Sequence, residues 1–218
     1  MLAVLDDLLM ILSLPRADAV AVYDRLAPRY ERLHRCWLRV GGAETVAAVQ
    51  GCLAAELRPG LRVLDAACGT GAIARWIAGQ EPGARLTLLD AAPAMLERAS
   101  AVPGRHVHGS LVELPFADGA FDLVICAWAL ETLDDPARAL AELCRVLAPG
   151  GLLCCCFCTA PTAWTGRLRS LPTRLAIERF FAARFLRADF ARGLASGPVR
   201  RMHYHGGLST LICHRRPA

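Results

Sequence analysis

The feature that most constrains how this chain can fold is a regular alternation of short apolar runs with segments of helical periodicity between residues 62 and 158. Alternating units of this kind build a parallel sheet covered by helices. After residue 198 two strand-like runs follow each other with only His205-Gly206-Gly207 between them, which predicts an antiparallel hairpin. We therefore expect an α/β fold: a doubly wound, mostly parallel seven-stranded sheet with a C-terminal antiparallel hairpin and helices on both faces. Strands are expected at 62–66, 85–90, 105–108, 121–128, 152–158, 199–204 and 208–214, and helices at 43–57, 72–78, 93–100 and 135–147.

Length and composition predict one globular domain. The chain has 218 residues, of which 55% are apolar, and at ~100–200 residues per domain this allows a single domain with a sizeable core. The first 38 residues have a helical pattern that Pro15 and Pro28 interrupt, and Gly41-Gly42 marks a turn.

The charge is distributed unevenly. Every basic residue is an arginine, and residues 161–218 hold 11 arginines against two acidic residues, whereas residues 1–160 hold 14 against 18. A basic C-terminal third can meet anionic substrates, phospholipid headgroups or nucleic acid. A solvated Arg-rich helical face explains the same excess, so both interpretations stay open.

No apolar run predicts a membrane span. The longest uncharged runs, 123–130 and 152–158, fall short of the ~20 residues that cross a bilayer. Asp6 and Asp7 stand where a secretory signal needs positive charge, so we expect a cytoplasmic protein. The apolar start at 8–12 and the Arg-rich C-terminal third also fit a peripheral membrane face, and a core helix explains the first segment equally well.

The 10 cysteines do not predict a metal site. Their spacings lack the two C-x-x-C pairs of a zinc ribbon. Cys154, Cys156 and Cys158 share one face of an expected strand, where a soft-metal site is conceivable, but small residues in a central strand that is covered on both faces explain them better. We expect reduced thiols and no metal.

The stretch VLDAACGTGAIARW, 63–76, predicts a ligand site. Gly69 and Gly71 allow a tight turn from a strand into a helix whose N-terminus presents unpaired N–H groups, as in Rossmann-like folds. Gly69 also begins a G-x-G-x-x-A pattern with Asp90 19 residues after Gly71, which fits a dinucleotide. Asp65, placed before the glycines, favours instead a ligand with a cationic amino-acid end, because a pyrophosphate repels a carboxylate.

Longer segments make the resemblance specific. VLDAACGTG, LLDAAPAMLERA (88–99) and the block from Gly109 to Leu153 resemble successive motifs of class I S-adenosylmethionine (SAM) dependent methyltransferases, especially the ubiquinone/menaquinone-biosynthesis-like group. VYDRLAPRYERLHR, 22–35, resembles the entry helix of that group. The resemblance fades after about residue 159, where such enzymes build their acceptor pockets.

The resemblance implies SAM as methyl donor, S-adenosylhomocysteine (SAH) as product, and roles for particular residues. Asp65 and the loop 69–71 hold the methionine end, Asp90 binds the ribose hydroxyls, and the backbone of Cys126 lies beside the sulfonium. It also implies a helical lid (1–42), a SAM-binding core (43–160), an acceptor-side helical insertion (161–198) and a closing hairpin (199–218) within one methyltransferase domain. The implied cofactor-binding residues are Tyr23, Tyr30, Asp65, Ala67, Cys68, Gly69, Gly71, Asp90, Ala91, Ser110, Leu111 and Cys126.

The acceptor is less constrained by the sequence. We expect a small molecule, hydrophobic, quinone-like or bearing a phospholipid headgroup, and we do not expect nucleic acid, because the Asn/Asp-Pro-Pro-aromatic element of base-amine enzymes is absent. Glu131 and His34 are the candidate catalytic residues, and Arg35, Trp128 and His203 are further candidates for acceptor contact.

Three residues depart from the family pattern: Ala67 replaces a glycine, Ser110 an acid and Thr132 a histidine. They leave open a catalytically silent methyltransferase-like partner subunit, and the G-x-G-x-x-A pattern with Asp90 leaves open an NAD(P)-binding oxidoreductase. The oligomeric state and the methylated atom are not constrained by the sequence.

Overall fold

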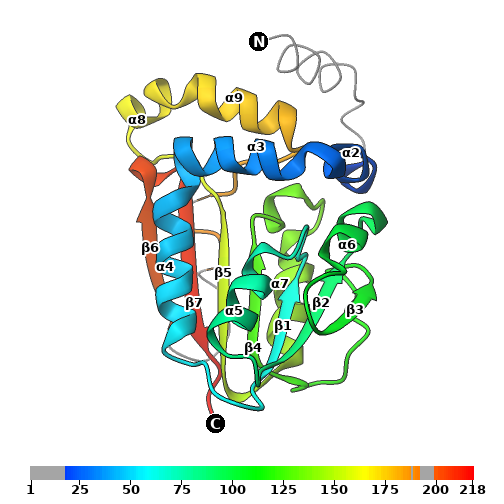
Figure 1. Cartoon of the computed structure of the whole chain (residues 1–218). Helices are drawn as coiled ribbons and strands as arrows, with labels where there is room; N and C mark the ends of the chain where they lie inside the picture. Colours follow the sequence, from blue (N-terminus) through cyan, green and yellow to red (C-terminus); the bar gives the residue numbers. More distant parts are fainter. Residues whose placement is uncertain (1–17, 188, 192–198) are drawn as a thin grey trace.

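The computed structural model describes residues 18–187, 189–191 and 199–218 and contains a seven-stranded sheet (Figure 1). The strand order is β3-β2-β1-β4-β5-β7-β6. β1 to β5 are parallel, whereas β7 runs antiparallel to β5 and β6 antiparallel to β7. The predicted α/β sheet with its terminal antiparallel hairpin is confirmed. The strands are β1 (Arg62–Ala66), β2 (Arg85–Asp90), β3 (Arg105–His108), β4 (Phe121–Ala127), β5 (Leu147–Cys158), β6 (Val199–Tyr204) and β7 (Ser209–Arg215).

Helices cover both faces of the sheet. Val49 and Leu53 of α4 and Ile77 of α5 pack on one face, and Leu143 and Val146 of α7 pack on the other. The central strands are therefore buried on both sides, which is why β4 and β5 read as nearly continuous apolar runs. The helices are α2 (Ala19–Leu26), α3 (Tyr30–Trp37), α4 (Ala43–Ala54), α5 (Ala72–Gln80), α6 (Pro93–Ala99), α7 (Pro136–Val146), α8 (Trp164–Arg169) and α9 (Leu171–Phe180), with short helical turns η1 (Ala27–Arg29), η2 (Leu38–Gly42), η3 (Leu130–Thr132) and η4 (His205–Gly207).

Two local expectations were wrong. Gly41-Gly42 makes no turn, because η2 carries the backbone helically from α3 into α4. Gly42 serves packing instead, since a Cβ there would lie 2.9 Å from Nε1 of Trp37. β5 starts at Leu147 rather than at 152, and its pairing with β4 shifts register between Phe121 and Leu123, which accommodates Pro149-Gly150-Gly151.

The N-terminal helices lie across the end of the sheet where the parallel strands terminate, and α8 and α9 lie beyond α3, farther from the sheet (Figure 1). This carboxyl edge is where open α/β sheets bind ligands. The predicted apolar start at 8–12 lies outside the described residues, as does part of the predicted insertion. Among the described residues, no helix is long and apolar enough to span a membrane.

Candidate functional site

The turn after β1 forms a left-handed cradle. Ala67, Gly69 and Gly71 have φ of 56°, 54° and 75°, a region that L side chains rarely adopt. The amide of Cys68 donates to the carbonyl of Leu89 (2.9 Å), which ties the turn to β2. This left-handed backbone explains why the family usually has glycine at position 67. Ala67 adopts the same conformation with the smallest side chain that carries a Cβ.

Asp90, at the end of β2, connects two loops. One carboxylate oxygen accepts from the amide of Gly69 (2.7 Å) and the other from the amide of Ala92 (2.9 Å). Burial raises the pKa of Asp90, and these two hydrogen bonds oppose the rise. Each oxygen can still accept a further hydrogen bond, so Asp90 can receive two ligand hydroxyls.

A pocket of about 740 Å³ lies beside this cradle, and we call it the cofactor pocket. Eight of the 12 residues predicted to bind the cofactor line it, contributed by α2, α3 and the loops after β1, β2 and β3. Its lining comprises Ala19, Val20, Tyr23, Tyr30, Ala67, Gly69, Leu89, Asp90, Ala91, Ala92, Gly109, Ser110, Leu111, Ala127, Trp128, Ala129, Thr132 and Leu133.

The other four predicted cofactor residues, Asp65, Cys68, Gly71 and Cys126, do not line this pocket. Asp65 lies beneath the turn, where its carboxylate accepts from the amide of Ala74 (3.1 Å) in the first turn of α5, and burial raises its pKa to about 7. Gly71 caps α5, and Cys126 is fully buried one residue before Ala127, which does line the pocket. Cys68 is buried in the core.

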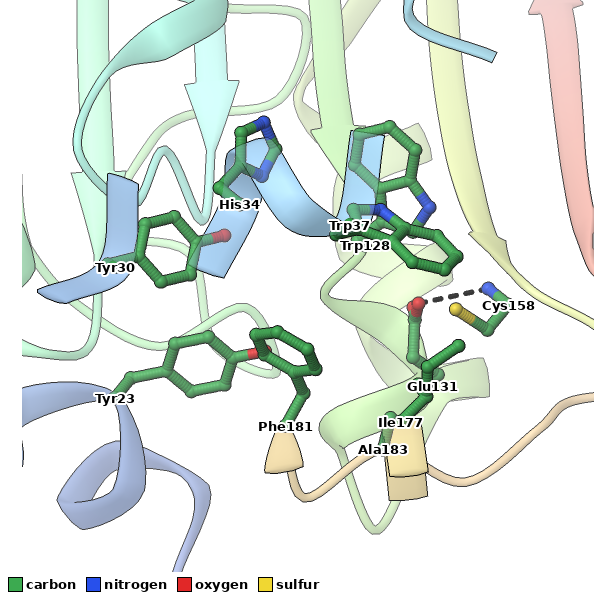
Figure 2. Close-up of a pocket in the computed structure, with 10 residues that line it drawn as sticks. All are labelled: Tyr23, Tyr30, His34, Trp37, Trp128, Glu131, Cys158, Ile177, Phe181 and Ala183. Atoms are coloured by element: carbon green, nitrogen blue, oxygen red, sulfur yellow. Dashed lines mark hydrogen bonds between the residues drawn. The ribbon is translucent and has the colours of Figure 1, made fainter. Parts of the chain in front are cut away.

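A second pocket of about 400 Å³ adjoins the first, and we call it the acceptor pocket. Tyr23, Tyr30 and Trp128 line both pockets, so the two spaces meet at these rings. Figure 2 shows the two tyrosines with His34 and Phe181 opposite the side formed by Trp128 and Glu131. The lining residues are Tyr23, Tyr30, His34, Trp37, Trp128, Glu131, Cys158, Ile177, Phe181 and Ala183.

Glu131 is the one acidic residue of the acceptor pocket and is 2% exposed. Its Oε1 accepts from the amide of Cys158 (2.9 Å), while Oε2 is buried and has no hydrogen-bond partner among the described residues. Burial raises the pKa of Glu131 to about 6. Nε1 of Trp128 is likewise buried and unpartnered. Buried polar atoms are normally hydrogen-bonded, so this pair leaves one acceptor and one donor for a ligand.

His34 lies in the acceptor pocket, although its neighbour Arg35 is exposed. Its ring stacks on Tyr30 at 5.7 Å, and burial lowers its pKa. Tyr30, His34 and Trp37 are spaced by four and three residues and therefore share one face of α3.

That spacing could have identified Trp37 from the sequence, whereas nothing local points to Ile177 or Phe181. His203 lies apart from both pockets and is hydrogen-bonded to Thr210 (2.8 Å). Thr132, which stands where the family often has histidine, donates to the carbonyl of Ala129 (2.7 Å).

All 10 cysteines are free thiols. Cys154 and Cys156 share the sheet face that packs against α4 and α5, and Cys155 faces the opposite cluster. Within the described part of the chain, no group of three or more His, Cys, Asp or Glu residues is arranged to hold a metal ion.

The comparisons with known proteins agree with this geometry. Residues 64–155, which span β1 to β5, match the model of a family described as a methyltransferase domain. The demethylmenaquinone methyltransferase of Thermus thermophilus is 38% identical over 138 residues, covering 61% of this chain and 62% of that protein. The biotin biosynthesis bifunctional protein BioCD of Bordetella avium is 30% identical over 203 residues, covering 91% of this chain and 43% of that protein.

A solved structure supports the fold. Magnesium protoporphyrin IX methyltransferase from Synechocystis aligns with a TM-score of 0.67 at 22% identity, over 91% of this chain and 100% of that one. Residues 64–155 are therefore similar to a methyltransferase domain, and the chain has the fold of the solved methyltransferase. The similarity to demethylmenaquinone methyltransferases agrees with the menaquinone- and ubiquinone-type resemblance noted in the sequence. The chain spans less than two thirds of the length of the two curated relatives.

Proposed function

We propose that this protein is a SAM-dependent methyltransferase that acts on a small-molecule acceptor. The observation that carries the proposal is the pair of adjoining pockets. One is formed by the turns that match the methyltransferase motifs, and the other holds an unpartnered carboxylate. The family match and the methyltransferase relatives favour this function over the NAD(P)-binding oxidoreductase.

The residues of the cofactor pocket fit SAM. Asp90 can accept hydrogen bonds from both ribose hydroxyls, because each of its oxygens keeps a free lone pair beside one backbone hydrogen bond. Ala67, Gly69 and Ala91 leave room for close approach of a ligand to the backbone. When bound, SAM supplies an electrophilic methyl group that needs alignment more than activation. Asp65 acts from beneath the turn, where it accepts a hydrogen bond from the amide of Ala74 in the first turn of α5.

Glu131 is the proposed proton acceptor. Its free Oε2 can take a proton from a hydroxyl, an amine or an acidic carbon, while Oε1 is held by the amide of Cys158. With a pKa of about 6, the carboxyl is ionised near neutral pH and can act as a base. His34, with a lowered pKa, and the two tyrosines, with raised pKa values, add neutral side chains around the acceptor.

For the acceptor we propose an apolar, quinone-like or phospholipid-headgroup compound, and hence contact with a membrane surface. The aromatic and aliphatic lining of the acceptor pocket supports a planar apolar group, and a relative is named for demethylmenaquinone. Among the described residues the pocket lining contains no arginine, and burial lowers the pKa of its one imidazole, His34, which argues against an acceptor that presents a carboxylate there.

The test is isothermal calorimetry with SAH on the wild type and on Asp90→Asn. Asparagine replaces one of the two acceptor oxygens by an NH2 donor, which accepts neither from the backbone amide nor from a ribose hydroxyl at that position, so affinity should fall by about tenfold to a hundredfold. Asp118→Asn, at an exposed side chain, is the matched control and should bind normally. A catalytic arm follows methylation of 1,4-dihydroxynaphthalene by mass spectrometry.

Four outcomes contradict the proposal or one of its parts. Heat with NADH but none with SAH would identify the oxidoreductase instead. SAH binding only after co-purification with a second chain would identify a silent partner subunit. Unchanged affinity in Asp90→Asn would remove the assigned role of that carboxylate. Failure to methylate the naphthalenediol would exclude a quinone-like acceptor.

A further inference from the structure

Large apolar side chains that remain exposed gather on one short segment of the described chain. Trp164, Leu168, Leu171 and Leu175 are 74%, 64%, 43% and 55% exposed, and Val20 is the other exposed large apolar residue in the described part. Trp164 and Leu168 lie on α8 and the two other leucines on α9, and Ser170 between the helices keeps a helical backbone (φ −86°, ψ −5°), so the spacing of four, three and four residues places them on one face. We call this set the α8–α9 stripe. A contiguous apolar patch of this kind marks an interaction surface.

The stripe is directly connected to the acceptor pocket. α9 turns the stripe outward, while Ile177 on its opposite face is buried and lines that pocket, and Phe181 lines it just beyond the helix end. In Figure 1, α8 and α9 form the layer farthest from the sheet on this side, beyond α3. The helix that walls the pocket therefore also presents the apolar surface.

The charge around the stripe indicates its partner. Residues 164–180 contain Arg167, Arg169, Arg174 and Arg179 against a single acid, Glu178. Helices with Trp and Leu on one face and arginine beside them lie in the interface of anionic membranes. A second copy of this chain fits less well, because a twofold contact through the stripe would bring the same basic segment against itself.

We propose that the α8–α9 stripe is the surface by which this protein rests on an anionic lipid membrane, so that an acceptor held in the lipid reaches the acceptor pocket along α9. The route to the acceptor rests on the proposed methyltransferase function, whereas the binding of lipid does not. The four apolar side chains lie between headgroups and acyl chains, and the exposed Arg167 and Arg169 contact lipid phosphates.

The experiment is co-sedimentation of the full chain with vesicles of phosphatidylcholine mixed with phosphatidylglycerol, compared with pure phosphatidylcholine. We expect binding to the mixed vesicles that weakens as salt is added. Leu168→Ser/Leu175→Ser should lower partitioning by about tenfold or more. Arg167→Gln/Arg169→Gln, at two exposed positions of α8, should lower it by about fivefold for each arginine.

Control measurements test whether vesicle binding depends on the α8–α9 stripe. Arg85→Gln/Arg98→Gln removes the same charge from exposed positions on the other half of the molecule, and it should bind vesicles nearly as the wild type does. The fluorescence of Trp164 should shift to the blue on binding, and this shift should be lost in Trp164→Phe. The apparent affinity for SAH, measured without vesicles, should be the same in all these variants.

Each outcome decides the proposal. Equal loss in both arginine pairs, or vesicle binding without a blue shift that depends on Trp164, would place the membrane contact elsewhere and overturn it. Dimerisation that Leu168→Ser/Leu175→Ser abolishes, without vesicle binding, would assign the stripe to a second copy. Vesicle binding through the stripe in a chain that does not bind SAH would support the lipid surface and refute the methyltransferase function.

Discussion

Glu131 and Asp90 are both buried carboxylates, but they are satisfied to different extents. Both oxygens of Asp90 hold backbone amides, and its carboxylate therefore also organises the turn after β1. One oxygen of Glu131 has no partner among the described residues. Leaving a buried charge half-satisfied costs stability, and such costs are typical of functional sites.

Replacing Glu131 should therefore stabilise the apo protein. Its pKa rises from an ordinary value of 4.5 to about 6 on folding, so ionised Glu131 destabilises the fold by about 2 kcal/mol above that pH. The stability that its raised pKa provides is present below about pH 4.5 and is lost as the pH rises through about 6. Glu131→Gln should gain about 2 kcal/mol in urea unfolding at about pH 8 and little at about pH 4.5.

Glu142 provides the matched control with the opposite sign. Its hydrogen bonds with Arg145 lower the pKa of Glu142, so its contribution is present above its ordinary pKa and is lost as the pH falls. Glu142→Gln should therefore lower stability at about pH 8. If both variants change stability in the same direction at that pH, the electrostatic assignment of Glu131 is wrong.

At the scale of elements, the junction of β1, the turn and α5 depends on glycine for two different reasons. Gly69 lines the cofactor pocket, whereas Gly71 faces the core, where a Cβ would lie 3.0 Å from Val102, 3.2 Å from Ala99 and 3.3 Å from Leu88. The resemblance placed both glycines at the cofactor. Contact of Gly71 with the cofactor stays a prediction, while its packing is a direct structural requirement.

Gly71→Ala should lower the free energy of unfolding by about 2–4 kcal/mol, because it combines a left-handed backbone with overpacking. Gly79→Ala, in the same helix with no atom within 4 Å of the added Cβ, should instead gain up to about 1 kcal/mol. Thermal unfolding without ligand measures both. Similar effects from the two substitutions would show that the contacts around Gly71 do not limit the helix start.

At the scale of the whole molecule, two distant parts of the chain complete a site whose centre is the sheet edge. α2 and α3 contribute Tyr23, Tyr30 and His34, and α9 with the segment after it contributes Ile177 and Phe181. β2 supplies Asp90 at its end, and η3, which follows β4, supplies Glu131. This arrangement supports the proposal that residues 1–42 act as a lid and 161–198 as the acceptor side, within the parts that the structure describes.

The lid proposal predicts selective protection from hydrogen exchange. Adding SAH should slow amide exchange in α2 and α3 together with the turn after β1, because Tyr23 and Tyr30 line the cofactor pocket. α7, on the opposite sheet face, is the internal control and should change little. Slower exchange in the turn alone, with α2 and α3 unchanged, would show that these helices do not close over the ligand.

The sequence by itself determined the order along the chain and the type of the sheet elements, because these depend on local signals, and the family resemblance named eight of the 18 residues that line the cofactor pocket. Alternating and helical patterns of apolar residues indicate strands and helices, and the glycines mark the turn after the first strand. Because Asp90 is an acidic residue at the end of a strand, it was predicted to contact the ligand. Local signals also placed β1, β2 and β3 at their observed bounds. Gly41-Gly42 was wrongly predicted to be a turn, because the sequence does not distinguish a glycine that a turn requires from one that makes room for a neighbouring side chain, as Gly42 does for Trp37.

Only the tertiary structure decided which side chains meet in the acceptor pocket and which apolar residues stay exposed. Ile177 and Phe181 join Glu131 across about 50 residues of chain, and no local pattern encodes a contact that depends on how α9 docks. The same holds for the α8–α9 stripe, since helical spacing identifies a face but not whether the fold covers it. Exposure is a property of packing between elements, and packing is set by the whole chain.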